Sequence, residues 1–149
     1  MKTVMQVLQG KSNQATYTIT PQATVLEAIS LMADKGIGAL IVAEGDRMVG
    51  IVSERDYARK VVLMERSSYN TLVRDIMTSA VLAVTAEETT ERCMGIMTEK
   101  RLRHLPVLSG ENIIGIVSIG DLVKEESTWR LPLIVRALLT SSSLRAIRR

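Results

Sequence analysis

The chain has 149 residues, of which 46% are hydrophobic, and a formal net charge of +3. This length supports one compact core, and no apolar run approaches the roughly 20 residues of a membrane helix. We expect a cytoplasmic protein, since the opening apolar stretch is too short for a secretory signal. A single cysteine forms no internal disulfide, and without a Cys or His cluster we expect no metal site.

The positive charge is concentrated in the C-terminal tail, residues 127–149, which hold five arginines and no acid. Residues 1–126 therefore carry 14 basic and 16 acidic side chains. Proteins that bind nucleic acid usually present Lys and Arg as a patch on the folded face, often interleaved with aromatic residues. This chain has no Phe and only 3% aromatic residues. We therefore expect no nucleic-acid partner for residues 1–126.

An internal repeat organises the chain. At an offset of 65 residues and without a gap, residues 19–56 are identical to residues 84–121 at twelve of 38 positions. The sequence GIVSERD at 50–56 returns as GIVSIGD at 115–121. The chain thus contains two copies of one unit.

The first copy predicts a helix, a hairpin and a second helix in that order. TVLEAISLMADK has Thr24 and Glu27 in capping-box positions and apolar residues at helical spacing, which predicts a helix. The apolar runs GALIVA and MVGIVS surround the turn EGDR and predict a hairpin. SERDYARKVVLME then predicts a helix with Ser53 as its N-cap.

The second copy repeats this order, with a helix at 90–100, strands at 104–108 and 113–118, and a helix from about Gly120. Neither copy buries much apolar surface alone, so we expect them to share a core. The prediction is an α+β fold in which two helix-strand-strand-helix units pack about a pseudo-twofold axis. The expected divisions of the chain are a first unit at 1–66, a linker and second unit at 67–126, and a basic apolar tail at 127–149.

A serine and an aspartate three residues apart occur at the same place in both copies, as Ser53 and Asp56 and as Ser118 and Asp121. One interpretation is ordinary helix-start chemistry, worth up to about 1 kcal/mol for each group. The other is a nucleotide site, because helix N-termini attract anions and a carboxylate accepts hydrogen bonds from ribose hydroxyls. The residues alone leave both interpretations open.

Together these patterns resemble a CBS-domain pair, in particular small stand-alone CBS-pair proteins. The resemblance spans about residues 2–124 and rests on DIMT at 75–78, RHLPV at 103–107 and the two GIVS..D strand ends. It implies a regulatory module with two clefts between the copies that bind adenosine-containing nucleotides. AMP and NAD are the leading candidates, ADP and ATP are alternatives, and some members bind S-adenosylmethionine.

The resemblance also implies which residues line the clefts. One cleft would use Ser53, Arg55, Asp56, Gly36, Ile37, Gly38, Ala39 and, from the other copy, Thr85. The second would use Ser118, Gly120, Asp121, Arg103, His104 and, from the first copy, Thr20. The clefts differ, because Arg55 offers a charge for phosphate where Gly120 offers none.

We expect a non-catalytic protein, a homodimer, that signals ligand occupancy to a partner protein. His104 with Ser118 and Asp121 suggests a hydrolase only weakly, because the first copy repeats the serine and the aspartate without a histidine. Two alternatives remain open. One is a structural or protein-interaction module without ligand, and the other is a nucleic-acid-associated regulator that acts through the basic tail.

Overall fold

The structure, a computed structural model, describes residues 2–125. The helices are α1 (Val4–Gly10), α2 (Val25–Lys35), α3 (Glu54–Tyr57), α4 (Val73–Ile76), α5 (Thr90–Lys100), α6 (Ile119–Glu125) and the π-helix η1 (Ala58–Val62). The strands are β1 (Thr18–Ile19), β2 (Ala39–Glu44), β3 (Arg47–Ser53), β4 (His104–Ser109) and β5 (Asn112–Ser118). The basic apolar tail at 127–149 lies outside the described residues.

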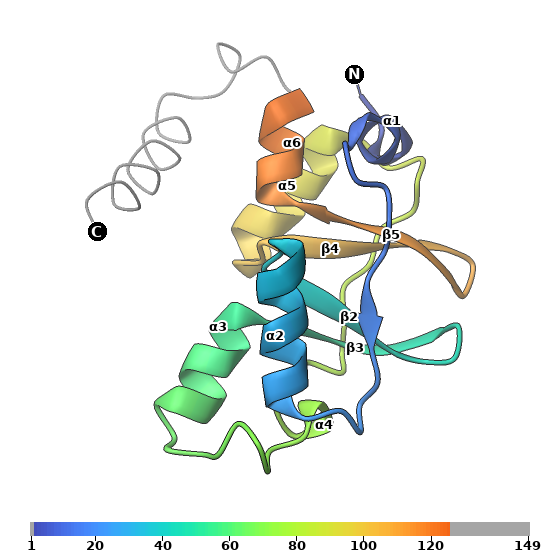
Figure 1. Ribbon diagram of the computed structural model, residues 1–149. Coiled ribbons are helices and arrows are strands. Elements are labelled where there is room, and N and C mark those ends of the chain that lie inside the picture. The colour runs from blue at the N-terminus through green and yellow to red at the C-terminus, as the bar shows by residue number, and fades with distance from the viewer. Residues whose placement is uncertain (1, 126–149) are drawn as a thin grey trace.

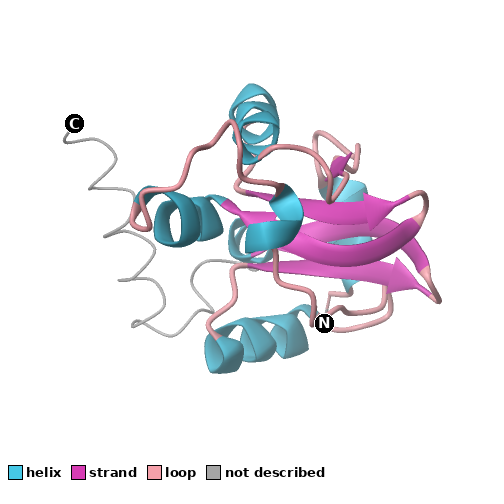
Figure 2. Cartoon of the chain, turned by 90° about the horizontal axis from the view of Figure 1, so that it is seen from below, coloured by secondary structure: helices cyan, strands magenta, loops and turns pink. Residues whose placement is uncertain are grey.

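The strands form one sheet in the order β1-β2-β3-β5-β4. Each copy supplies an antiparallel hairpin, and the hairpins meet where Arg47 pairs with Asn112. The register is the same in both copies, since Ala39 faces Ser53 and His104 faces Ser118. Figure 1 shows the two hairpins one above the other, and Figure 2 shows helices on either side of the strands. The predicted α+β repeat is confirmed.

Helices α2 and α5 occupy equivalent positions and begin at the threonines that the repeat indicates. Thr24 and Thr89 each accept a hydrogen bond from the backbone N–H three residues further on, at 3.2 and 3.1 Å. Both helices end at a residue in the left-handed conformation, Gly36 with φ 65° and Arg101 with φ 55°. This conformation is free of strain for glycine and not for arginine, so the second copy makes the same turn at a higher cost.

The helix predicted from Ser53 takes a different form from the expected one. Ser53 caps α3 as predicted, but the α-helix ends at Tyr57 and continues as the π-helix η1 to Val62. The regular helical path therefore stops short of the end of SERDYARKVVLME at residue 65.

Contrary to the expectation of a shared core, two apolar cores lie on the two hairpins, and the short helices α1 and α4 are exchanged between them. Val4 and Val7 of α1 belong to the core of the second copy, with Leu105 and Leu122. The core of the first copy instead contains Val73 and Ile76 of α4. The packing thus crosses the division expected at residue 66, because each hairpin is covered by the short helix that precedes the other.

No helix in the described part of the chain combines the length and the apolar character needed to cross a bilayer.

Candidate functional site

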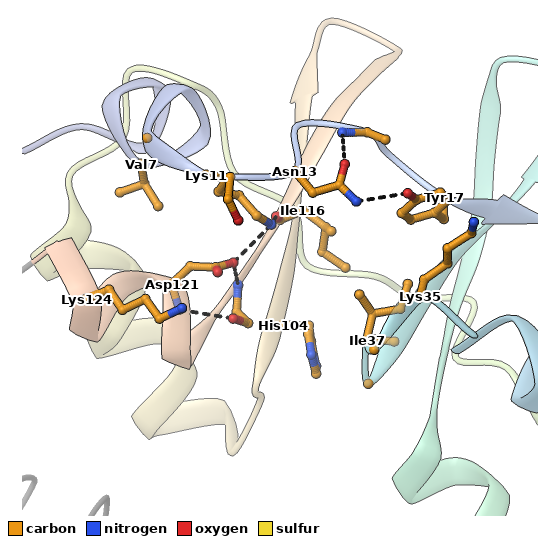
Figure 3. A pocket seen from close by; sticks show the side chains of 17 residues that line it. Val7, Lys11, Asn13, Tyr17, Lys35, Ile37, His104, Ile116, Asp121 and Lys124 are labelled. Atoms are coloured by element: carbon orange, nitrogen blue, oxygen red, sulfur yellow. Dashed lines mark hydrogen bonds and ion pairs between the residues drawn. The ribbon is translucent and has the colours of Figure 1, made fainter. Parts of the chain in front are cut away.

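A cavity of about 520 Å³ opens between the two copies, near the starts of β2 and β4 and the end of β5. Figure 3 shows Lys11 and Asp121 on one side, Tyr17, Lys35 and Ile37 on the other, and His104 between them. The lining residues come from both copies and from the segment between α1 and β1. They are Val7, Gly10, Lys11, Ser12, Asn13, Ala15, Tyr17, Lys35, Gly36, Ile37, Gly38, Ala39, His104, Ile116, Ser118, Asp121 and Lys124.

The start of α6 supplies the serine and the aspartate of the cavity. The backbone N–H of Ser118 donates to Asp121 Oδ2 at 2.9 Å, and the backbone N–H of Asp121 donates to Ser118 Oγ at 3.1 Å. This reciprocal capping box satisfies donors that a helix start would otherwise leave unpaired. The hydrogen bond from Ser118 and the ion pair with Lys11 both fall on Oδ2 of the carboxylate, and Oδ1 has no partner among the described residues.

Lys11 is the basic residue in direct contact with this carboxylate. Its Nζ lies 3.1 Å from Asp121 Oδ2 and donates to the carbonyl oxygen of Ile116 at 3.1 Å. The side chains are only 28% and 21% exposed, so solvent screens this ion pair less than a surface pair. Lys11 thereby ties the segment after α1 to the end of β5.

His104 lies at the junction of the two copies. A Cβ atom at Gly38 would lie 3.5 Å from the His104 Cε1 atom, so the ring passes close to the backbone that begins β2. Burial lowers the pKa of His104; the charge of Asp121 opposes this shift, and those of Arg103 and Lys11 add to it. The ring is therefore neutral near pH 7. Within residues 2–125, no hydrogen bond joins it to Ser118 or Asp121, so the geometry of a Ser/His/Asp triad is not formed.

The opposite wall combines aromatic and polar groups. Asn13 Nδ2 donates to the Tyr17 hydroxyl at 2.9 Å, and Asn13 Oδ1 accepts from the backbone N–H of Ala15 at 3.0 Å. The ammonium of Lys35 lies 5.3 Å from the centre of the Tyr17 ring, within the range of a cation–π interaction. These contacts hold residues 13–17 in place as one side of the cavity.

The structure groups the expected residues differently from the sequence analysis. The loop Gly36–Ala39 was assigned to the cleft of Ser53, but it lines the cavity of Ser118 and Asp121. The reason is that the starts of the two hairpins lie next to each other, since the backbone at Gly38 lies close to the His104 ring. His104 lines this cavity as expected. Seven expected residues are not among those that line it: Thr20, Arg103 and Gly120, which were expected in this cleft, and Ser53, Arg55, Asp56 and Thr85, which were expected in the other.

The equivalent region of the first copy is built around Asp56. Ser53 and Asp56 form the same capping box, with the Ser53 N–H 2.9 Å from Asp56 Oδ2. Lys60, four residues further on, lies 3.2 Å from Asp56 Oδ1 and donates to the Ile76 carbonyl at 2.8 Å. Both aspartates are therefore paired with a lysine, but the lysines come from different parts of the fold.

Sequence reasoning missed ten lining residues, among them the basic and aromatic residues Lys11, Tyr17, Lys35 and Lys124. Lys11 and Tyr17 precede the repeat as it was aligned, from residue 19. Extending the offset of 65 residues further back would have placed Lys11 opposite Ile76, a lysine against a buried isoleucine. That mismatch was the available signal.

Cys93 is not part of the site. It is fully buried in the core of the second copy, and burial followed by the charge of Glu88 raises its pKa to about 11. A thiol with this pKa stays protonated at neutral pH, so packing accounts for the residue.

Comparisons with known proteins agree with this architecture. The model of the CBS domain matches residues 13–63 and again 73–127. A solved protein with CBS domains from Burkholderia ambifaria is 53% identical, with a TM-score of 0.82 over 88% of this chain and 98% of that chain. The mitochondrial CBS domain-containing protein CBSX3 of Arabidopsis thaliana is 39% identical over 82% of this chain, which spans only 63% of its length.

A second solved structure is more distant, and its similarity to this chain concerns the fold alone. It is the CBS domain pair of protein MJ0100, solved in complex with 5′-methylthioadenosine and S-adenosyl-L-methionine. It is 20% identical, with a TM-score of 0.73 over 83% of this chain and 94% of that chain. The twofold match of the family model, the internal repeat and the paired hairpins together show that this chain belongs to the CBS domain family.

Proposed function

We propose that the cavity at Asp121 binds an adenosine-containing nucleotide, with AMP and NAD as leading candidates and ADP and ATP as alternatives. The observation that carries the proposal is the position of Asp121 on a 520 Å³ cavity with its Oδ1 atom unengaged by the described residues. Ligand pockets typically measure about 300–1,000 Å³, so the space is suitable for a nucleotide. The distant MJ0100 pair, solved with two adenosine derivatives, gives further support.

The proposed chemistry divides the ligand among three groups of residues. The Asp121 carboxylate accepts hydrogen bonds from the ribose hydroxyls. Lys11 and Lys124 supply positive charge for phosphate, and the N-terminus of α6 favours an anion. Ile37 and Ile116 offer an apolar surface to the base. Each part of a nucleotide therefore meets a side chain of matching chemistry.

We further propose that the protein is non-catalytic and that occupancy of the cavity is signalled to a protein partner. The cavity joins segments of both copies, so a ligand that binds one arrangement of the copies better shifts the population toward it. Self-association as a homodimer fits an exposed apolar strip of Val62, Leu63, Met64 and Tyr69, which are 54–74% exposed. Sedimentation of the protein as a monomer at all concentrations would contradict the dimer.

The test of nucleotide binding uses the only histidine of the sequence as a local probe. Addition of AMP or NAD should shift the His104 ring resonances in an NMR titration, because the ring lines the cavity. Asp121→Asn keeps an acceptor for the Ser118 N–H and removes the charge, so it should weaken binding about 10-fold to 100-fold.

Asp56→Asn is the matched control, since it makes the same change outside this cavity. It should leave the His104 titration unchanged. If no adenine nucleotide shifts the ring, the interpretation of Ser118 and Asp121 as helix-start chemistry is sufficient, and the proposal fails.

A further inference from the structure

The cavity has more positive than negative charge among its lining residues. Lys11, Lys35 and Lys124 line it, whereas Asp121 supplies its single carboxylate. Lys35 is also 3.4 Å from Asp34, outside the lining, and its side chain is 37% exposed, so part of its charge is balanced elsewhere. Lys11 differs from the other two lysines because it contacts the carboxylate that the ligand needs.

A ligand whose two ribose hydroxyls bind both oxygens of the Asp121 carboxylate finds no competing partner at Oδ1 and competes with Lys11 for Oδ2. The two partners of the Lys11 ammonium in the described part of the chain are Asp121 Oδ2 and the Ile116 carbonyl. Its side chain is 28% exposed, so water compensates only part of a lost partner. Removing one partner from a partly buried charge is costly unless another group replaces it.

We propose that Lys11 is a specificity-determining residue that restricts this cavity to phosphorylated adenosine ligands. The inference rests on the proposed function and names the ligand class that the site accepts. A phosphate carries a charge of about −1.5 to −2 near neutral pH and replaces Asp121 as a partner of the ammonium. Adenosine offers no anion in exchange, and the sulfonium of S-adenosylmethionine adds a positive charge beside the lysine.

The region around Asp56 lacks this restriction. Its lysine, Lys60, sits four residues further along the same helical segment, and its side chain is 44% exposed. A ligand that displaces Lys60 from Asp56 releases it toward water, where the charge is readily solvated. Discrimination between phosphorylated and neutral ligands is therefore a property of the Lys11 arrangement, not of the serine–aspartate pattern that both copies share.

The experiment measures the affinities of the full chain for AMP, adenosine and S-adenosylmethionine by calorimetry. Wild-type protein should bind AMP at least about tenfold more tightly than adenosine, and S-adenosylmethionine more weakly than adenosine. Lys11→Met keeps an apolar stem of similar length and removes the ammonium. It should reduce the ratio of AMP to adenosine affinity by about tenfold, because AMP binding weakens while adenosine gains access to Asp121.

Lys35→Met is the matched control, because it removes the same charge from the same cavity without touching Asp121. It should change the affinity ratio by about threefold or less. An equal fall in both variants would show a general charge effect, and an unchanged ratio in Lys11→Met would show a structural role; either result overturns the inference. If wild-type protein binds neither AMP nor adenosine, the proposed function fails and the inference with it.

Discussion

The two copies differ most in the segments that cover the ends of their equivalent strands β3 and β5. In the first copy, Thr78 forms a two-way backbone bridge with Ile51, with hydrogen bonds of 2.9 and 3.0 Å. At the equivalent place in the second copy, the Ile116 carbonyl accepts a hydrogen bond from the side chain of Lys11. The backbone of Thr78 therefore bonds to Ile51 of β3, whereas a lysine side chain bonds to the equivalent Ile116 of β5.

This difference shows how a nearly symmetric repeat can produce unequal sites. A covering backbone segment adds to the sheet and leaves little room, as Met77 and Thr78 do over Gly50. A lysine reaches its acceptor through a thin apolar stem, and the space beside it forms part of the 520 Å³ cavity. The strands are alike, so the covering segments decide which copy has a cavity of this kind.

The largest expected difference in stability is between substitutions at positions 76 and 11, which are equivalent at the 65-residue offset. Ile76 is 1% exposed in the core of the first copy, so Ile76→Ala should cost about 2–5 kcal/mol of unfolding free energy through the cavity it leaves. Lys11→Ala removes a partly exposed ion pair and should cost about 1 kcal/mol or less. Urea denaturation of both variants measures the difference. Similar costs would mean that the side chains at positions 76 and 11 do not differ in packing as described above.

A smaller difference in stability is expected between substitutions of Gly50 and Gly115, which are equivalent in the repeat. A Cβ at Gly50 would lie 2.7 Å from Met77 Sδ and 2.9 Å from the Thr78 carbonyl oxygen, whereas at Gly115 the nearest atom is Leu8 Cδ2 at 2.8 Å. Backbone cannot move aside as a leucine end can. Gly50→Ala should therefore cost about 2–3 kcal/mol and Gly115→Ala about 1 kcal/mol, the range for overpacking. Thermal denaturation of the pair checks the order, which a reversed result would refute.

The smallest expected effect is on the pH dependence of stability. It concerns the equivalent positions 39 and 104, where the first copy has alanine and the second has histidine. The folded protein lowers the pKa of His104 below 6.5, so the unfolded chain binds more protons between the folded pKa and 6.5. The stability due to neutral His104 is complete above pH 6.5 and declines as the pH falls through the folded pKa. Each unit of pKa difference corresponds to about 1.4 kcal/mol.

His104→Gln tests this dependence, because it removes the titration and keeps a polar side chain. The stability difference between about pH 7.5 and about pH 5.5 should be smaller in the variant than in the wild type. Carboxylates titrate in both proteins and cancel in the comparison. An identical pH dependence would show that the histidine does not contribute.

Much of the fold could be predicted because the repeat encodes it locally. Thr24 and Thr89 mark the helix starts, and Gly50 and Gly115 fix the offset between two hairpins of the same register. The exchange of α1 and α4 could not be predicted. Seven- and four-residue helices carry too few apolar positions to indicate which sheet they cover.

The candidate site was predicted in its parts and not in its grouping. Ser118, Asp121 and His104 meet in one cavity as expected, because they lie on a hairpin and the helix that follows it. Gly36–Ala39 also lines this cavity, although it belongs to the first copy. The sequence pattern does not indicate how the two copies are oriented about the pseudo-twofold axis, so this grouping could not be predicted. Lys11 was missed for a related reason, since its contact with Asp121 spans nearly the whole described chain.

The exchange of α1 has a consequence for the order in which the protein folds. Val4 is synthesised before the second hairpin, yet it packs in the same core as Val117 and Leu122 near the other end of the described chain. At about 5–20 residues per second, the ribosome needs on the order of ten seconds to make the intervening chain. A seven-residue helix is unstable alone in water. We therefore expect α1 to become helical late, when the second hairpin emerges to receive it.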